Sequence, residues 1–529
     1  MHTPNGLIII SVFWCTLLSI FCSGPAQGES SLPVDNDPVF REAADFLNQG
    51  MYLEAIGAYR EIADYSEHRE TRARALLFMG TTMSLYLNNA DDAISVFNHV
   101  IDAYPDSQAA PDALFNSGMT CYEKGDYSGA HQAFVRYLKA YPHGIRRQSV
   151  EVWEQSAEER IGTPMPGENP PDSPILADTI IRVLLATCKS SLTVSGQGRI
   201  RLTGMPSGRT AYQGKGAATV SATNGKIMVN GTVLRDNRVT AVSEGVTINL
   251  SPSATYRGEL SITAHAQGLS VINHIPVEEY LYGVIPREMP HTWEMEALKA
   301  QAISARTYVL YIKSKSRDKP FDVAATTSSQ MYGGHKAERE KTTRAVNATR
   351  GRVISYQGNL IVAYFHADSG GHTEDAVNVW GANLPYLKGV PDKFSTHTPN
   401  SAWEVYLPFS EMKNRLTRSS IDVGRITDVK PETQSASGRA LGLALKSTRG
   451  TARMTGNNFR IRMGAERLKS TLFHLEPLKD GVRFTGKGYG HGVGLSQWGA
   501  QTMALKGYTA NDILNHYYRD ITIVSLKID

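Results

Sequence analysis

Residues 276–312, PVEEYLYGVIPREMPHTWEMEALKAQAISARTYVLYI, decide the fold of the second half of the chain. The first half of this stretch predicts a short extended or turning segment that ends in the run 286–290. In the second half, alanines and larger apolar residues recur at three- and four-residue steps from Ala297 to Ile312. This spacing predicts a helix with one buried stripe, and Thr292 is its expected cap.

One carboxylate, Glu288, lies between Pro286 and Pro290. A proline fixes its own φ and restricts the residue before it, so Glu288 has stiff neighbours. Stiffness of this kind suits a general acid, and it equally suits a clean entry into the helix that follows. The local residues alone leave both interpretations open.

Length and composition indicate a multidomain globular protein. A chain of 529 residues exceeds one ordinary core, and about two to four domains are expected. An apolar content of 41% with 20% charged residues excludes a disordered or coiled-coil chain. The formal net charge of +4 is small for this length and compatible with a polyanionic cell-wall surface. No nucleic-acid partner is expected.

The N-terminus predicts export. Residues 7–21 form an apolar run of signal-peptide length, too short to span a bilayer comfortably, and small residues follow it. We expect a signal peptide over residues 1–28 and a mature protein in the periplasm or cell envelope. An uncleaved anchor and lipidation at Cys22 are the alternatives. Cys121 and Cys188 then remain in different predicted domains, so a disulfide framework is not expected.

Residues 37–160 repeat themselves in units that predict helix–turn–helix pairs, in which small residues let two helices approach. The aligned positions are Ala55, Ala93 and Ala130; Tyr59, Phe97 and Phe134; and Gly80 and Gly118. This pattern resembles the tetratricopeptide repeat, with residues 148–161 as a capping helix. The resemblance implies a concave surface for a protein partner, and a packing spacer is the alternative.

A proline-rich linker is expected over residues 161–176, and a domain of mixed strands and helices over residues 177–529. Short alternating apolar runs predict its strands, and Asn230-Gly231 predicts a two-residue hairpin turn. Two helices close the chain, the second capped by Thr509. The predicted fold class is an all-α tetratricopeptide-like solenoid followed by an α+β domain with β-rich insertions.

Three further clusters, residues 365–374, 486–499 and 328–334, carry polar side chains beside glycines. The two histidines of the first cluster have no cysteine with them and match no common zinc spacing, so no metal is expected. The glycines of the second permit a close approach of backbone to a ligand or simply a tight turn. This cluster lacks the Walker and dinucleotide patterns, and no cofactor is expected.

These clusters, taken together and in this order, resemble the SpoIID/LytB family over roughly residues 177–526. The matching motifs are residues 279–290, 298–302 with 305–308, 366–374 with 379–381, and 490–497. The resemblance implies an exported lytic transglycosylase that cleaves peptidoglycan glycan strands, preferably after removal of the stem peptides. Other members are described as amidase enhancers.

For the site, the resemblance implies Glu288 as general acid and base. A transglycosylase needs one carboxyl, because the sugar's own 6-hydroxyl is the nucleophile, whereas hydrolysis usually needs two. Arg306 follows eighteen residues later, a multiple of the helical repeat, which predicts the same helical face. The resemblance implies that Arg306 lines the cleft, where it could contact substrate oxygens. The expected substrate-contacting or scaffolding residues are Gln330, Tyr332, His366, Ser369, His372, Tyr489, His491 and Gln497.

The leading hypothesis is a lytic transglycosylase whose repeats dock a wall-remodelling partner. Two alternatives remain: a non-catalytic glycan-binding amidase enhancer, and an envelope scaffold built on the repeats. Some relatives are said to bind zinc through cysteine and histidine in the middle region. This sequence has no cysteine there, so that metal is not expected. The oligomeric state cannot be deduced from the sequence.

Overall fold

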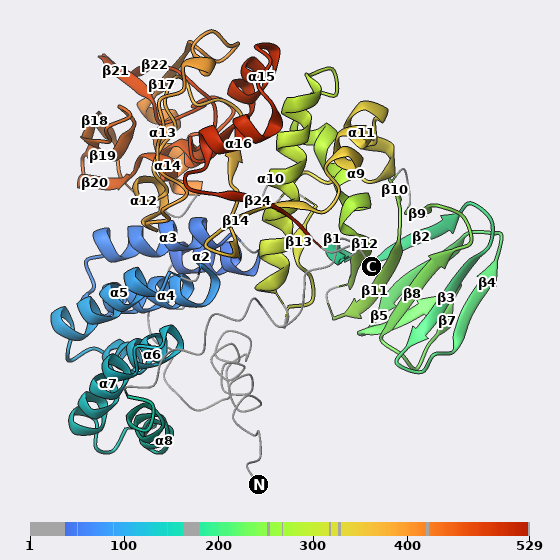
Figure 1. The fold of residues 1–529 in the computed structure, drawn as a ribbon, viewed down its shortest axis with the longest axis horizontal. Coiled ribbons are helices and arrows are strands. Elements are labelled where there is room, and N and C mark those ends of the chain that lie inside the picture. The colour runs from blue at the N-terminus through green and yellow to red at the C-terminus, as the bar shows by residue number, and fades with distance from the viewer. Residues whose placement is uncertain are drawn as a thin grey trace.

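The computed structural model of the chain describes residues 38–526 except 50, 88, 145, 162–178, 251–253, 267, 317–318, 326–329 and 419–422. The signal peptide expected over residues 1–28 and nearly all of the expected linker lie outside the described residues. The described chain forms a helical solenoid followed by a larger part of sheets and helices (Figure 1), which confirms the predicted fold class. None of the described helices is long and apolar enough to cross a membrane.

The solenoid consists of antiparallel helix pairs that follow the repeats of the sequence. In the second and third pairs, the aligned aromatic residue of one helix presses onto the aligned glycine of the other. A Cβ added at Gly118 would lie 2.5 Å from Cε1 of Phe134, and one added at Gly80 would lie 2.7 Å from Cε1 of Phe97. The helices are α2 (Pro38–Asn48), α3 (Tyr52–Tyr65), α4 (Arg69–Leu87), α5 (Ala90–Ala103), α6 (Ala109–Lys124), α7 (Tyr127–Ala140) and α8 (Arg147–Glu158).

Two largely antiparallel sheets follow and share an apolar core that includes Leu202, Val220 and Ile262. Their strand orders are β13-β1-β12-β11-β8-β3-β4 and β10-β9-β2-β5-β6-β7. Asn230 and Gly231 have φ of 49° and 82°, which confirms the predicted hairpin turn. The strands are β1 (Ile180–Lys189), β2 (Ser191–Gly196), β3 (Ile200–Met205), β4 (Thr210–Gly214), β5 (Ala218–Thr223), β6 (Lys226–Val229), β7 (Thr232–Val233), β8 (Arg238–Ser243), β9 (Ile248–Leu250), β10 (Ala254–Tyr256), β11 (Glu259–His265), β12 (Gly268–Pro276) and β13 (Val323–Ala324).

Two helices, α9 (Val277–Glu288) and α10 (Met295–Ser314), follow β12 directly. The prediction of an extended or turning segment before residue 290 is wrong. Pro276 is the N-cap of α9, and Pro286 lies in its last turn. Pro286 lacks the N–H that would hydrogen-bond back into the helix, and the helix ends two residues later.

The chain leaves the helical conformation between α9 and α10. Met289 is extended, with φ of −128° and ψ of 142°, and the N-cap of α10 is Glu294 rather than Thr292. Glu288 and Arg306 therefore lie on two different helices. The helical spacing between them, on which the expectation of a shared face rested, does not exist in the fold.

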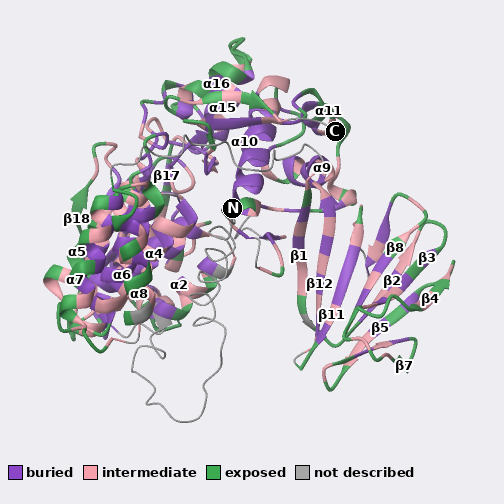
Figure 2. Cartoon of the chain, turned by 60° about the horizontal axis from the view of Figure 1, so that its bottom comes forward, coloured by how far each residue is buried: buried purple, intermediate pink, exposed green. Residues whose placement is uncertain are grey.

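Helix α10 is buried along nearly its whole circumference (Figure 2). Neighbours on different sides include α9, α11, α15, α16 and β14. The remaining elements are η2 (His335–Ala337), α11 (Glu340–Ala348), β14 (Arg352–Tyr356), β15 (Asn359–Leu360), β16 (Phe365–His366), α12 (Ala376–Trp380), η3 (Lys393–Ser395), β17 (Trp403–Pro408), α13 (Phe409–Arg418), β18 (Ile426–Gln434), β19 (Ala440–Ser447), β20 (Gly450–Thr455), α14 (Gly456–Arg462), β21 (Phe473–Leu478), β22 (Gly481–Gly486), β23 (Leu495–Ser496), α15 (Gln497–Leu505), α16 (Ala510–Tyr517) and β24 (Thr522–Ser525).

Pairing of distant strands folds the C-terminal part back onto this centre. Strand β16 pairs in parallel with β23, so Phe365 lies beside Leu495 and His366 beside Ser496. The last strand, β24, pairs with β14. Helix α16 begins with the predicted capping box, in which Thr509 and Asp512 exchange hydrogen bonds. Residues 365–374, called the histidine turn below, and residues 486–499, called the glycine cluster, are thereby brought together.

The first repeats share one apolar core with the C-terminal part. This core runs from α2–α5 through α9, α10 and α12. Polar contacts also cross the boundary: Arg60 donates to the carbonyl of Val377 at 3.1 Å, and Lys319 donates to the carbonyl of Leu47 at 2.8 Å. The outer helices α6–α8 form a further core of their own, while Ala109 and Ala113 of α6 still belong to the shared core. The solenoid is therefore attached by its N-terminal end (Figure 1).

The glycine–aromatic contact of the repeats predicts the sign of a stability change. Gly118→Ala should lower the free energy of unfolding by about 1–3 kcal/mol, because the new methyl overlaps the Phe134 ring. Helix propensity alone would raise it by about 1 kcal/mol. Urea unfolding of the full chain, followed by circular dichroism, measures the change. In the double variant with Phe134→Leu the two losses should be less than additive, and strict additivity would contradict the contact.

Candidate active site

A pocket of about 360 Å³ lies where α9, the histidine turn and the glycine cluster meet. Of the ten residues predicted for the site, five line this pocket: Glu288, His366, Tyr489, His491 and Gln497. They come from segments that are far apart in the chain and are joined by the β16–β23 pairing and by a bridge between Asp368 and Tyr489. The pocket is the candidate active site.

Glu288 is placed at the C-terminal end of α9 and is half-buried. Its Oε1 accepts a hydrogen bond from the Met331 N–H at 3.0 Å, and the Gln497 side chain also hydrogen-bonds to it. Burial raises the pKa of Glu288 above its usual value, although these two hydrogen bonds oppose the shift. A carboxyl with a raised pKa and preformed donors for its ionised form suits both giving and taking a proton.

The two pocket histidines are neutral. His491 accepts the Val493 N–H at its Nδ1, at 3.1 Å, and donates from Nε2 to the Phe365 carbonyl at 3.1 Å. Burial, followed by the charges of Arg460 and Arg439, lowers its pKa to about 3. Burial likewise lowers the pKa of His366 far below its usual value.

His366 presents a free acceptor. Its Nδ1 lies 3.0 Å from the carbonyl of Val493, which places the ring proton on that nitrogen. Its Nε2 is buried and has no hydrogen-bond partner among the described residues. A neutral Nε2 in this state accepts a hydrogen bond from a hydroxyl or an amide N–H.

The glycines of the second cluster serve close packing against the strand that carries His366. Gly490 has φ of 111°, and a Cβ there would lie 2.8 Å from the Cβ of His366. Gly494 has φ of 71°, and a Cβ there would lie 2.1 Å from the carbonyl oxygen of Tyr364. A side chain at either position would separate the two segments. The glycines thus bring backbone close to backbone at the pocket wall.

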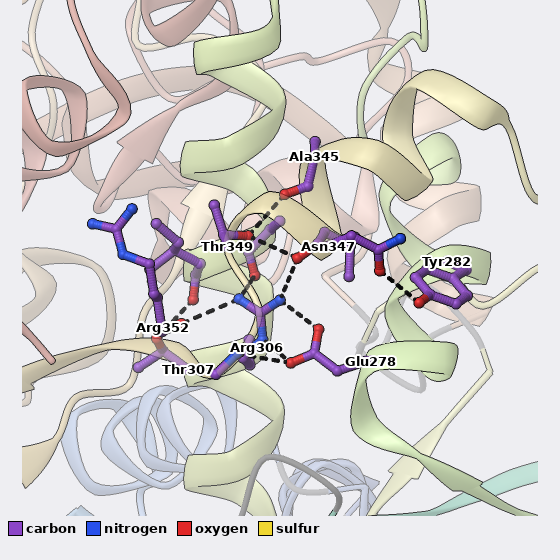
Figure 3. Close-up of polar contacts among 12 residues, drawn as sticks. Glu278, Tyr282, Arg306, Thr307, Ala345, Asn347, Thr349 and Arg352 are labelled. Atoms are coloured by element: carbon purple, nitrogen blue, oxygen red, sulfur yellow. Dashed lines mark hydrogen bonds and ion pairs between the residues drawn. The ribbon is translucent and has the colours of Figure 1, made fainter. Parts of the chain in front are cut away.

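Arg306 lies outside the pocket, and the expectation that it lines the cleft is wrong. Its side chain is 0% exposed and forms a two-point ion pair with Glu278, at 2.8 Å and 2.6 Å (Figure 3). It also donates to the carbonyls of Arg352 at 3.1 Å and Val346 at 3.3 Å. Arg306 therefore ties α9 and α10 to α11 and β14, and the structure gives it a scaffolding position.

Four other predicted residues do not line the pocket either: Gln330, Tyr332, Ser369 and His372. Gln330 accepts from the Tyr280 hydroxyl at 3.2 Å and donates to the carbonyl of Ala305 at 3.3 Å. Tyr332 donates to Asn273 at 3.0 Å. Met331, between them, supplies the N–H that holds Glu288, so Gln330 and Tyr332 anchor the segment that positions the carboxyl.

Ser369 and His372 hold the histidine turn in shape. The Ser369 hydroxyl donates to Asp392 at 2.8 Å, and His372 Nδ1 contacts the carbonyl of Thr373. Neither lines the pocket. The sequence analysis predicted that each of them contacts substrate or serves as scaffold, and their contacts in the structure are those of scaffolding residues.

The sequence analysis did not identify several residues that line the pocket. Most of them lie inside a predicted cluster or motif, or directly beside one in the case of Tyr364: Tyr308, Met331, Tyr364, Phe365, Ala367 and Gly490. Two come from the repeat domain, Met51 and Glu54, and no motif marked them. Among the described residues, no group of three or more His, Cys, Asp or Glu side chains is arranged to hold a metal ion.

Comparison with known proteins supports the family resemblance. A family model described as "Stage II sporulation protein" matches residues 265–356, a tetratricopeptide-repeat model matches residues 74–107, and a domain of unknown function matches residues 398–494. The chain is 34% identical over 353 residues to an uncharacterized protein of Brachyspira hyodysenteriae, covering 65% of this chain and 93% of that protein.

Two relatives from Bacillus subtilis have functional names. Stage II sporulation protein D is 32% identical over 283 residues, which cover 50% of this chain and 79% of the relative. A protein named Amidase enhancer is 33% identical over 295 residues, which cover 46% of this chain and 40% of the relative. Of the pocket residues, Glu288, Tyr308 and Met331 lie within residues 265–356, which the family model matches.

The position of Arg306 predicts that its removal affects stability first. Arg306→Ala should lower the free energy of unfolding by about 3–5 kcal/mol, because the Glu278 carboxylate is left buried without its partner. Lys299→Ala on the same helix breaks a partly exposed ion pair with Glu296 and should cost less than about 1 kcal/mol. Urea unfolding of both variants measures the difference. Wild-type stability of Arg306→Ala would contradict the scaffolding position.

Proposed function

This chain belongs to the SpoIID family, and we propose that it is an exported lytic transglycosylase of peptidoglycan. The bond cleaved is that between N-acetylmuramic acid and N-acetylglucosamine in peptide-stripped glycan strands, and the products have 1,6-anhydro ends. The observation that carries the proposal is Glu288, a carboxyl of raised pKa that faces a pocket and is held by Met331 and Gln497.

The reaction needs a single carboxyl that acts twice. Protonated Glu288 gives its proton to the glycosidic oxygen, and the bond to the leaving N-acetylglucosamine breaks. The resulting carboxylate takes the proton of the 6-hydroxyl of N-acetylmuramic acid, whose oxygen bonds to the anomeric carbon and closes the ring. The raised pKa favours the first step, and the donors from Met331 and Gln497 stabilise the carboxylate present between the steps.

The rest of the pocket suits the hydroxyl and acetamide groups of a sugar. His366 offers a free acceptor at Nε2, Gln497 has both a donor and an acceptor, and Tyr489 adds a ring and a hydroxyl. Because both pocket histidines are neutral, they add no positive charge beside the acid. Sugars are bound in this way, through many uncharged hydrogen bonds around one ionisable group.

Location and protein partner belong to the same proposal. Export and a place in the periplasm or cell envelope rest on the sequence of residues 1–28. The outermost helices α7 and α8 belong to a core separate from the one shared with the C-terminal part, and the proposed docking surface for a wall-remodelling protein lies on them. Peptidoglycan glycan strands are the proposed substrate.

Glu288→Gln tests the proposal. The purified full chain is incubated with peptide-stripped glycan strands, and 1,6-anhydro ends are counted by mass spectrometry. We expect the variant to produce these ends at least about a hundredfold more slowly, because an amide carries no proton to donate. Glu279→Gln, on the same helix but outside the pocket, should retain the wild-type rate.

Three results would overturn the proposal: equal rates for Glu288→Gln and wild type, reducing ends in place of 1,6-anhydro ends, or no cleavage by the wild type. Cleavage-free binding of glycan would favour the second candidate function, a glycan-binding amidase enhancer. The similarity to the relative named Amidase enhancer supports that candidate.

A further inference from the structure

The repeat domain forms one wall of the pocket. Met51 and Glu54, at the start of α3, line it together with Glu288 and the histidines. Glu54 is therefore a second carboxyl in a pocket for which the proposed reaction requires only one. It comes from a domain outside the region that matches the Stage II sporulation model.

Close packing holds α3 against the pocket. A Cβ added at Gly57 would lie 3.3 Å from Cδ1 of Trp380, so the helix backbone lies directly on that ring. One turn later, Arg60 donates to the carbonyl of Val377 at 3.1 Å. On the pocket side, the Tyr364 hydroxyl donates to Oε2 of Glu54 at 3.3 Å. These contacts fix the direction of the Glu54 side chain.

The Glu54 carboxyl has spare capacity to bind a ligand. None of the lysines and arginines in the described part of the chain forms an ion pair with it, whereas Glu61 on the same helix faces Arg462 at 3.8 Å. Its hydrogen bonds come from Tyr364 and from its own backbone N–H. An ionised carboxylate accepts about four hydrogen bonds, so a hydrogen-bond donor that enters the pocket finds a free acceptor.

We propose that Glu54 is a substrate-binding residue of the active site, and that it accepts a hydrogen bond from a hydroxyl or amide N–H of a sugar bound beside Glu288. The sugar is an N-acetylglucosamine unit, since the lactyl carboxylate of N-acetylmuramic acid would be repelled by a second carboxylate. The first repeat is then part of the site that binds glycan. The identity of the ligand as glycan rests on the proposed function.

Both pocket carboxyls have a raised pKa, and that of Glu54 lies near neutral pH. Burial raises the pKa of Glu54 to about 7, and it raises that of Glu288. The other titratable groups that face the pocket are Tyr308, Tyr364, Tyr489, His366 and His491. Burial lowers the pKa of both histidines and raises that of Tyr308 and Tyr364, so these four stay neutral between pH 6 and 8.

The test measures binding in a Glu288→Gln background, where Glu54 is the remaining carboxyl of the pocket. The ligand is a peptide-free tetrasaccharide of alternating N-acetylglucosamine and N-acetylmuramic acid, and calorimetry gives Kd at pH 6 and pH 8. Binding should tighten about fivefold to tenfold from pH 6 to pH 8, because the carboxylate that accepts the hydrogen bond forms as pH rises through about 7.

Adding Glu54→Gln should weaken binding at pH 8 about tenfold and abolish its pH dependence. The glutamine still accepts from Tyr364, so the fold is retained, and circular dichroism checks this. Glu54→Asp keeps the carboxylate but shortens the side chain by one methylene, which draws the charge back from the ligand. This variant should bind more weakly and keep the pH dependence. Glu61→Gln is the matched control: it removes a buried carboxyl of the same helix, with a pKa also raised to about 7, that lies outside the pocket.

The inference is overturned if Glu54→Gln and Glu61→Gln bind the tetrasaccharide equally well at both pH values. It is also overturned if the Glu288→Gln protein does not bind the tetrasaccharide at all. The cleavage assay separates this outcome from failure of the proposed function. If the wild type forms 1,6-anhydro ends and Glu54→Gln changes neither KM nor binding, only the role of Glu54 is refuted. If binding depends on Glu54 but the wild type does not cleave the glycan, only the proposed transglycosylase activity is refuted.

Discussion

The buried ion pair between Arg306 and Glu278 joins the elements on which the pocket depends. Glu278 lies in the first turn of α9, and Glu288 ends the same helix. Arg306 belongs to α10 and reaches α11 and β14 through carbonyl oxygens. A charge at such depth is tolerated only when it is fully paired. The pair therefore fixes how α9 lies against α10, and with it the direction in which Glu288 projects.

Desolvation controls the electrostatics of the pocket. Burial raises the pKa of Glu54 and Glu288 and lowers that of His366 and His491. Each shift favours the uncharged form, as expected where water is displaced by protein. The pocket thus combines few charges with many hydrogen-bonding groups, which suits a saccharide. The wall contributed by α3 is part of this effect, because it covers a side that would otherwise be open to solvent.

The repeats have two physical environments. The first helix pairs bury their apolar faces in the core that they share with the C-terminal part. The outer helices have a further core of their own. Repeat proteins bury a continuous core by stacking neighbours, and here the first neighbour on one side is a different domain. One end of the solenoid is consequently a component of the pocket, and the other end has a core of its own.

Local sequence determined much of this protein. Spacing of alanines, aromatics and glycines predicted the helix pairs; Asn230-Gly231 predicted its hairpin; and Thr509 predicted its cap. These features depend on residues within a few positions of each other, so the chain's local geometry decides them. The motifs likewise identified Glu288, His366 and His491, which line the pocket.

Only the tertiary structure decided which side chains face the pocket. Arg306 stands in a motif beside the site, yet Glu278 draws it into the core, since a buried guanidinium needs a carboxylate partner. Glu54 stands in no motif and is placed beside Glu288 by packing of α3 on Trp380, a contact between segments more than three hundred residues apart. Packing of distant apolar surfaces leaves no local pattern in the sequence, because each surface is specified separately and they meet only in the folded chain.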